Sequence, residues 1–179
     1  MRVLVAYSSK YGSTRGIADR IGERLRVAGH EVDVEECDNI EYPEGFDAFI
    51  VGSAAYMGNW RKEARKFVQH NRELLASRPT WLFSSGPLGT DLVDKEGRDV
   101  VETGRPKEFD DFVSLLRPRA VRVFFGAWDP AAPPIGVAER LMHLAPAGKS
   151  ALPAGDFRDW DAIDAWADKV AAELETTNA

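Results

Sequence analysis

Four short apolar runs divide the chain, and each has the length of a buried strand. They cover residues 2–6, 46–53, 80–84 and 120–126. In the first two runs the apolar residues follow one another instead of alternating with polar ones, which predicts strands that are covered on both faces. The other two runs predict the next strand and the last strand of the core. A fifth segment, residues 30–36, alternates Val32 and Val34 with charged residues. This alternation is typical of a strand at the edge of a sheet.

Stretches with a helical apolar stripe lie between these strands. Ile17, Ile21 and Leu25 recur at every fourth position, which predicts a helix over residues 13–28 that stops at Gly29. The same periodicity predicts three later helices: one that runs from about residue 61 until Pro79 breaks it, one that begins near Lys107, and one over residues 159–174. The last has the clearest stripe, formed by Trp160, Ile163, Trp166, Ala167, Val170 and Leu174.

Strands that alternate with helices predict an α/β fold of right-handed βαβ units, in which helices cover both faces of a parallel sheet. We expect one domain over residues 1–179, a flavodoxin-like three-layer sandwich in its layout, with five strands in the order 2-1-3-4-5. In such sheets, ligands bind beyond the carboxyl ends of the strands, where the strand order reverses. The loops expected at that place are residues 8–14, 54–60 and 84–89.

Two segments are additional to a minimal domain of this kind, and we expect both to lie over the end of the sheet where ligands bind. The first is residues 88–106, within which residues 92–103 have Gly97 at their centre and predict a short hairpin. The second is residues 128–157, with five prolines and one helical piece over residues 137–144. Lids, partner surfaces and inert decorations are alternatives that the sequence leaves open.

Composition narrows the class of protein. The net charge of -6 argues against nucleic-acid binding, which depends on many Lys and Arg contacts to phosphates. The single cysteine, Cys37, rules out an internal disulfide, and His30, His70 and His143 have no metal-ligand spacing, so we assign no metal. No run approaches the roughly 18 apolar residues of a membrane-spanning helix. Because a strand begins almost at the N-terminus, we expect no signal peptide and a cytoplasmic protein.

The first of the three loops, with the sequence YSSKYGST over residues 7–14, is rich in hydroxyl groups. It joins a buried strand to the start of a helix, where unpaired backbone N–H groups and the positive end of the helix dipole favour an anion. The short donors Ser8, Ser9, Ser13 and Thr14 add to this set, so the loop predicts a phosphate site. The alternative is an ordinary turn in which Ser13 caps the helix.

The other two loops are small-residue loops beside aromatic residues. In the second loop, Ala54 and Ala55 let the backbone approach a flat ligand, and Gly58 can adopt a positive φ. Tyr56 and Trp60 are expected to supply aromatic faces beside it. The third loop, residues 84–89, again combines small residues with hydroxyl groups. A phosphate site joined to two such loops predicts a phosphorylated planar ring as the ligand.

These motifs resemble a known family. The strand followed by YSSKYGST looks like the FMN phosphate loop of flavodoxins. The segment FIVGSAAYMGNW and the helix over residues 159–174 look like the flavodoxin-domain family that includes the menaquinone-dependent protoporphyrinogen oxidases of bacterial haem synthesis. The resemblance covers nearly the whole chain and implies FMN as the cofactor.

The resemblance also implies which residues hold FMN. The phosphate would be enclosed by Ser9, Lys10, Tyr11, Gly12, Ser13 and Thr14. The isoalloxazine would be bordered by Ala54, Ala55, Tyr56, Met57, Gly58 and Trp60. Its other side would be closed by Ser85, Gly86, Pro87 and Leu88. The flavin carries the redox chemistry, so we assign no catalytic side chain, and we expect a carbonyl near Gly58 to accept a hydrogen bond from flavin N5.

The implied function is that of an FMN-dependent oxidoreductase similar to protoporphyrinogen oxidase, with a porphyrinogen, a quinone or a redox protein as its partner. The alternatives are a flavodoxin-type electron carrier, a flavodoxin-like quinone reductase, and a domain that has lost FMN and serves only protein contacts. Four basic residues after the second loop favour either an anionic substrate and peripheral contact with the inner face of the cell membrane, or a merely solvated helix face. They are Arg61, Lys62, Arg65 and Lys66.

Three other classes of protein have a related fold, but this chain lacks the residues that their chemistry requires. A phosphatase or arsenate-reductase-like domain needs a cysteine in the first loop, and a receiver domain needs acidic residues after the first strand to bind Mg²⁺. Tyr7 and Ser8 stand there instead. A dinucleotide-binding loop needs G-x-G-x-x-G, of which Gly12 and Gly16 alone are present.

Overall fold

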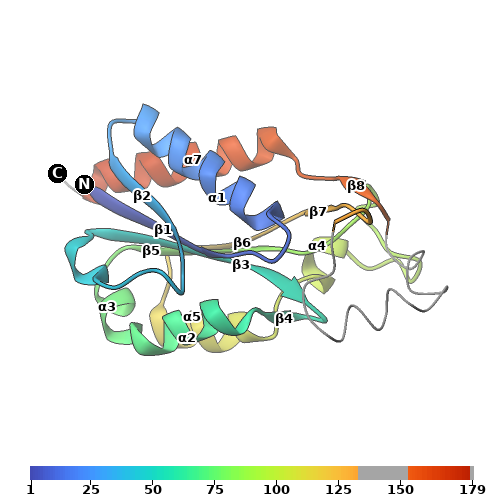
Figure 1. The fold of residues 1–179 in the computed structure, drawn as a ribbon, viewed down its shortest axis with the longest axis horizontal. Coiled ribbons are helices and arrows are strands. Elements are labelled where there is room, and N and C mark those ends of the chain that lie inside the picture. The colour runs from blue at the N-terminus through green and yellow to red at the C-terminus, as the bar shows by residue number, and fades with distance from the viewer. Residues whose placement is uncertain (133–152, 178–179) are drawn as a thin grey trace.

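A computed structural model describes residues 1–132 and 153–177 of the chain. Its main sheet has five parallel strands in the order β2-β1-β3-β5-β6 (Figure 1). The strands are β1 (Arg2–Ser8), β2 (Glu31–Glu36), β3 (Ala48–Tyr56), β5 (Thr80–Ser85) and β6 (Ala120–Phe124). In chain order this is the arrangement 2-1-3-4-5, so the predicted topology is confirmed.

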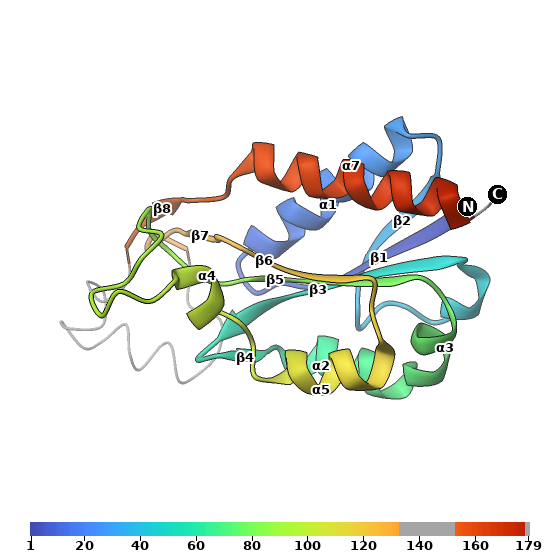
Figure 2. The same cartoon turned by 180° about the vertical axis from the view of Figure 1, so that it is seen from behind.

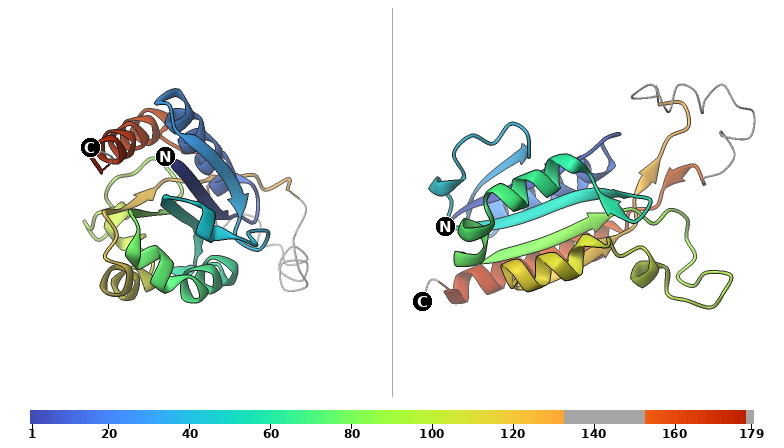
Figure 3. Two further views of the ribbon diagram at one scale, coloured as in Figure 1. Left: turned by 90° about the vertical axis from the view of Figure 1, so that its left-hand side faces the viewer. Right: turned by 90° about the horizontal axis from the view of Figure 1, so that it is seen from below.

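Helices cover both faces of the sheet (Figures 1 and 2). One face packs against α1 (Ser13–Val27) and α7 (Trp160–Thr177), and the other against α2 (Lys62–His70), α3 (Arg72–Ser77) and α5 (Glu108–Leu116). Figure 3 shows these three layers from two further sides. A short 3-10 turn, Pro43–Gly45, precedes β3. The predicted three-layer sandwich is therefore confirmed.

Each face of the sheet has its own apolar core. The core under α1 contains the predicted stripe of Ile17, Ile21 and Leu25, all fully buried. In the same core the tip of the Phe83 ring lies over Gly52 on the neighbouring strand, so close that a Cβ on Gly52 would overlap the ring. Gly52 is thus required by packing, because any side chain there would displace a buried aromatic ring.

The predicted continuous helix before Pro79 is wrong, because it divides at Asn71. Asn71 has φ -106° and ψ 18°, which leaves the helical backbone conformation. Its side-chain amide donates to the Phe67 carbonyl at 2.9 Å, and its own carbonyl accepts the Leu75 amide at 2.9 Å. Asn71 therefore ends α2 and starts α3.

The predicted loop over residues 54–59 is also wrong in part, because β3 continues to Tyr56 and the chain then folds back on itself. Met57 and Gly58 form the turn, with φ of 52° and 75°, and β4 (Asn59–Trp60) pairs antiparallel with the end of β3. Two successive positive φ values are typical of a two-residue β-hairpin. The second loop is therefore a tight hairpin that projects beyond the sheet (Figure 1).

The described parts of both extra segments lie beyond the carboxyl end of the sheet (Figure 3). The predicted hairpin over residues 92–103 is reduced to one bridge between Val93 and Asp99, after which Asp99 caps α4 (Val100–Thr103). In the second segment, β7 (Ala127–Trp128) pairs antiparallel with β8 (Gly155–Asp156). The predicted helical piece over residues 137–144 lies outside the described residues.

Two ion pairs join α1 to α7. Arg20 contacts Asp164 at 2.6 Å, and one helical turn further along both helices Arg24 contacts Asp168 at 2.6 Å. Within residues 1–132 and 153–177, no helix is both long and apolar enough to cross a membrane. The same residues bring no three His, Cys, Asp or Glu side chains together in a way that would hold a metal ion.

Candidate functional site

The three predicted loops meet because their strands end side by side. In the parallel register Ser8 lies opposite Ser53, and Ser53 lies opposite Ser84. A narrow cleft of about 60 Å³ follows directly beyond these strand ends. It is lined by Ser9, Tyr11, Ser13, Thr14, Ala54, Ala55, Tyr56, Ser85, Gly86, Leu88, Gly126, Ala127 and Trp128. All of these residues except the last three were predicted site residues.

The first loop closes on the N-terminus of α1 in a conformation that suits an anion. Gly12 precedes the helix with φ 85°, its amide donates to Ser9 Oγ at 3.1 Å, and the first helical bond runs from the Gly16 amide to the Gly12 carbonyl. No heavy atom lies within 4 Å of the position that a Cβ on Gly12 would take. The first turn of α1 contains no acidic residue. The loop therefore combines an open approach with donors that no carboxylate of that turn occupies.

Two buried hydrogen bonds tie the first loop to its neighbours. Thr14 and Ser85 are almost fully buried, and their hydroxyl groups lie 2.8 Å apart, which joins the first loop to the third. Ser13 Oγ accepts the amide of Ala127 at 2.8 Å, which joins the first loop to the segment after β6. The Ser13 hydroxyl keeps its own proton to donate.

Aromatic rings and one cation surround the mouth of the cleft. The ammonium of Lys10 lies 5.4 Å from the ring centroid of Tyr11 and 5.8 Å from that of Tyr56, so it bridges the first and second loops. The edge of Trp128 meets Tyr11 at 5.3 Å between centroids and 79° between planes. The described part of this mouth is therefore largely aromatic, with the positive charge of Lys10 near its rim.

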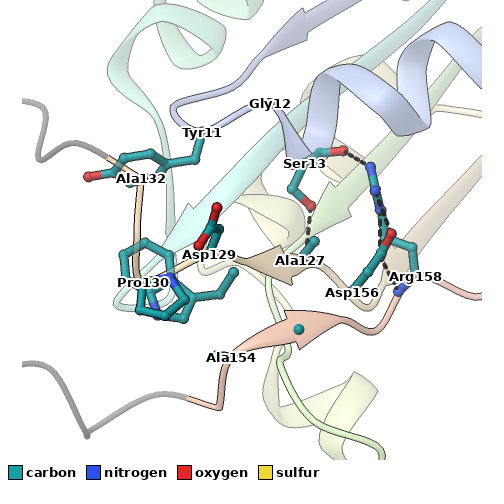
Figure 4. Close-up of a pocket in the computed structure, with 12 residues that line it drawn as sticks. Tyr11, Gly12, Ser13, Ala127, Asp129, Pro130, Ala132, Ala154, Asp156 and Arg158 are labelled. Atoms are coloured by element: carbon teal, nitrogen blue, oxygen red, sulfur yellow. Dashed lines mark hydrogen bonds and ion pairs between the residues drawn. The ribbon is translucent and has the colours of Figure 1, made fainter.

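A larger cavity of about 650 Å³ adjoins the cleft (Figure 4). The two share Tyr11, Ser13, Ala127 and Trp128, which therefore form the boundary between them. The far wall of the larger cavity comes from Asp129, Pro130 and Ala132, and from residues 154–156 with Arg158. Its volume lies in the range of ordinary small-molecule sites, whereas that of the cleft lies well below it.

A sequence model of the flavodoxin domain matches residues 4–142, which include all three loops. The chain belongs to the flavodoxin domain family. Among curated proteins it is similar to the protoporphyrinogen IX dehydrogenase [quinone] of Escherichia coli strain K12, with 29% identity over 86 residues. That match covers 47% of this chain and 48% of the relative, so it spans about half the length of the curated protein.

Solved structures show the same fold. Rubredoxin oxygen:oxidoreductase from Desulfovibrio gigas aligns with a TM-score of 0.63 and 14% identity, over 99% of this chain and 37% of that one. A flavodoxin from Pseudomonas aeruginosa, solved as a cysteine-to-serine mutant, aligns with a TM-score of 0.60 and 17% identity, over 98% of this chain and 99% of that one. The flavodoxin fold therefore extends over the sheet and both helical layers described above.

Some predicted site residues of this flavodoxin domain do not reach the cleft. The indole of Trp60 is 2% exposed and packs against Phe109 and Phe112 in the core under α2 and α5, so it does not line the cleft. Met57 is 95% exposed at the hairpin tip. We expected a carbonyl near Gly58 to accept a hydrogen bond from flavin N5, and the carbonyl of Gly58 itself accepts the amide of Lys107 at 2.9 Å.

The remaining three predicted residues lie just outside the cleft lining. Lys10 stands over the two tyrosine rings, and Gly12 lines the larger cavity. Pro87 packs beside Gly104, and its carbonyl accepts the amide of Gly126 at 2.8 Å. The contacts of Pro87 with Gly104 and Gly126 therefore hold the third loop in place.

Sequence reasoning missed the segment after β6. Gly126, Ala127 and Trp128 line the cleft, and a Cβ on Gly126 would lie 3.5 Å from Ser13 Oγ, in ordinary van der Waals contact. The signal was a glycine at the end of the last predicted strand and a tryptophan two residues after it. Arg158, which lines the larger cavity, was also missed, because it lies just before the last helix and outside every predicted loop.

The predicted basic cluster after the second loop is partly paired. Arg61 contacts Glu63 at 3.2 Å and donates to Ser8 Oγ at 2.9 Å, while Arg65 contacts Glu108 at 3.5 Å. These two arginines therefore brace α2 against β1 and α5. Lys62 and Lys66 are the other two members of the cluster, and both are exposed.

Proposed function

We propose that this flavodoxin domain binds FMN at the carboxyl end of its sheet, with the phosphate held by residues 9–14. The observation that carries the proposal is the donor set at the start of α1. Hydroxyl groups of Ser9, Ser13 and Thr14 gather there, Gly12 leaves the approach open, and the first helical turn has no acidic residue. Phosphate is an anion that such a helix N-terminus accommodates well.

The ring of FMN would lie between the β3–β4 hairpin and the third loop. Ala54 and Ala55 form the floor on one side, and Gly86 approaches so closely that a Cβ on it would be 3.2 Å from Ala55 Cβ. A cleft of about 60 Å³ is too small for a tricyclic ring. We therefore infer that the side chains of Tyr56 and Trp128, both partly exposed, turn outward when the ring enters.

Bound FMN would supply the redox chemistry of the reaction. The chain's own residues then have three tasks. The first loop holds the phosphate, the buried Thr14–Ser85 bond keeps the first and third loops at a constant spacing, and the tyrosines near Lys10 exclude water from the mouth.

We further propose that the domain is an FMN-dependent oxidoreductase that acts on a porphyrinogen or a quinone. The similarity to protoporphyrinogen IX dehydrogenase [quinone] supports this substrate class. A second support is the cavity of about 650 Å³ that shares Tyr11 and Trp128 with the cleft, where a substrate would lie beyond the phosphate-binding edge formed by the first loop. An enzyme needs room for a substrate beside its flavin, whereas a carrier needs only an exposed flavin edge.

A flavodoxin-type electron carrier is the second candidate, and the charge of the chain favours it. The net charge of -6 suits docking to a basic redox partner. In that case the large cavity would have no substrate, and the hairpin tip at Met57 would lie in the contact with the partner.

The test is anaerobic reduction of the FMN-loaded protein, followed by the flavin absorbance. Protoporphyrinogen is added to one sample, and a menaquinone analogue is added after it; free FMN at the same concentration is the control. Bleaching that is faster than in the control, with recovery on adding the quinone, supports the enzyme. A protein whose flavin is bleached by dithionite in a parallel sample but not by protoporphyrinogen favours the carrier. A protein that does not retain FMN contradicts the whole proposal.

A further inference from the structure

Arg158 is held in one position at the edge of the large cavity. Its Nε and Nη2 donate to the two carboxylate oxygens of Asp156 at 2.7 and 2.6 Å, and its Nη1 donates to the Ser13 carbonyl at 3.3 Å (Figure 4). The guanidinium also lies 4.4 Å from the ring centroid of Trp160. The side chain is 17% exposed. These contacts therefore fix a cation against the first turn of α1.

The first turn of α1 makes room for this cation. A Cβ on Gly16 would lie 2.5 Å from Arg158 Nη1, so a larger residue at that position would displace the guanidinium. Arg158 uses three of its five N–H groups in the bonds to Asp156 and Ser13. The other two, one on each terminal nitrogen, have no partner among the described residues.

The same cavity is lined by Tyr11, Gly12 and Ser13 of the first loop. Among the described residues of its lining, Arg158 supplies the sole positive charge, while Asp129 and Asp156 supply negative charges. The Asp129 carboxylate accepts the amide of Ala131 at 2.8 Å. The loop itself offers neutral donors, namely hydroxyl groups and amides. Among the described residues that line this cavity, Arg158 is thus the side chain that can donate charge-assisted hydrogen bonds to an anion.

We propose that Arg158 recognises the phosphate of FMN and that Asp156 positions it for this task, an inference that rests on the proposed function. Arg158 lies on the flank of the helix whose N-terminus offers the amides, so the phosphate meets neutral donors in front and a cation at the side. Asp156 keeps the guanidinium in the plane that faces the cavity and also lowers the net charge of the pair. This role makes β8 part of the cofactor site.

The alternative is that the Arg158–Asp156 ion pair is only structural, a clasp that holds β8 against α1. Two substitutions separate the two roles, because they break the same ion pair but change the charge in opposite directions. Arg158→Gln removes the cation and leaves the Asp156 carboxylate beside the loop. Asp156→Asn breaks the clasp and leaves the cation with its full charge.

The experiment measures binding of FMN and of riboflavin, which lacks the phosphate, to the apo-protein by quenching of flavin fluorescence. We expect R158Q to weaken FMN binding about ten-fold or more, the usual effect of losing a charge-assisted hydrogen bond, and to leave riboflavin unchanged. We expect D156N to bind FMN as tightly as the wild type or more tightly. Arg24→Gln is the matched control, since Arg24 makes a similar pair with Asp168 further along α1.

Three outcomes overturn the inference. If R158Q and D156N weaken the binding of FMN and of riboflavin equally, Arg158 only holds β8 against α1 and does not recognise the phosphate. If R158Q binds FMN as tightly as the wild type, Arg158 has neither role in flavin binding. Equal affinity of the wild type for FMN and riboflavin shows that the phosphate is not recognised at all. If R158Q does not fold, R158K is measured, and a kept preference for FMN over riboflavin supports the role of the charge while a lost preference contradicts it. A wild type that binds no flavin instead contradicts the proposed function.

Discussion

The hydrogen bond between Thr14 and Ser85 offers the sharpest test of how the first and third loops are joined. The two hydroxyl groups lie 2.8 Å apart, with Thr14 fully buried and Ser85 3% exposed. Thr14→Val keeps the shape of the side chain but leaves the Ser85 hydroxyl buried without this partner. An unpaired buried hydroxyl destabilises a protein by about 1–3 kcal/mol. We therefore expect T14V to lower the free energy of unfolding by about that amount.

A double-mutant cycle isolates this bond. The Ser85→Ala change leaves the Thr14 hydroxyl unpaired in the same way, whereas the double variant removes both polar groups together. The double variant should therefore be less destabilised than the sum of the singles, by roughly 1 kcal/mol. The measurement is urea unfolding of the apo-protein, followed by far-ultraviolet circular dichroism at neutral pH. Additive effects of the two substitutions would refute the claim that this bond links the loops.

The matched control is Thr80→Val at the other end of the sheet. Thr80 is 2% exposed, and its hydroxyl donates to the Leu75 carbonyl at 2.8 Å. This variant should lose a comparable stability but keep its affinity for FMN, because it lies far from the first loop. T14V should weaken FMN binding as well. Equal FMN affinities in the two variants would contradict the placement of the phosphate beside Thr14.

Three further predictions concern the core and the titratable groups. Gly52→Ala should lower the midpoint of urea unfolding, because its Cβ would overlap the Phe83 ring and overpacking costs about 1–3 kcal/mol; an unchanged midpoint would contradict the described packing. Hydrogen bonds from Arg20 lower the pKa of the Asp164 carboxyl below its unfolded value of about 3.9, so this stabilisation is present above that pH and is lost as the pH falls through the folded pKa. Asp164→Asn should therefore flatten the fall in stability below about pH 4, as measured by thermal melts across the acid range. Burial raises the pKa of the Cys37 thiol, so a thiol reagent at about pH 8 should label it slowly in the native protein and quickly in urea.

The order of the sheet and the site at its carboxyl end were predictable because they follow from local patterns. Apolar runs flanked by helical stripes mark buried parallel strands, and parallel strands with crossover helices place their following loops at one end. Thr14 and Ser85, 71 positions apart in the sequence, could therefore be placed in one site before any contact was known. The predicted strand order was enough to place both residues at the same end of the sheet.

The rest depended on contacts that a single sequence does not reveal. Trp60 was placed beside a ring because it follows the second buried strand, but the turn at Met57 and Gly58 reverses the chain and directs the indole into the core. An aromatic residue in a two-residue strand faces either side with equal ease, and burial against Phe109 decides between them. Arg158 was missed because its place depends on β8 pairing with β7 across a long connection.

The measurement that tests the proposed cofactor site most directly is hydrogen–deuterium exchange of the apo-protein with and without FMN. We predict slower exchange at the amides of residues 12–15, where the phosphate would bind, and at residues 54–58 and 85–88, which would border the ring. A titration followed by flavin fluorescence establishes that FMN is bound under the same conditions. FMN that is bound while the amides of residues 12–15 exchange as fast as before would contradict the site described here.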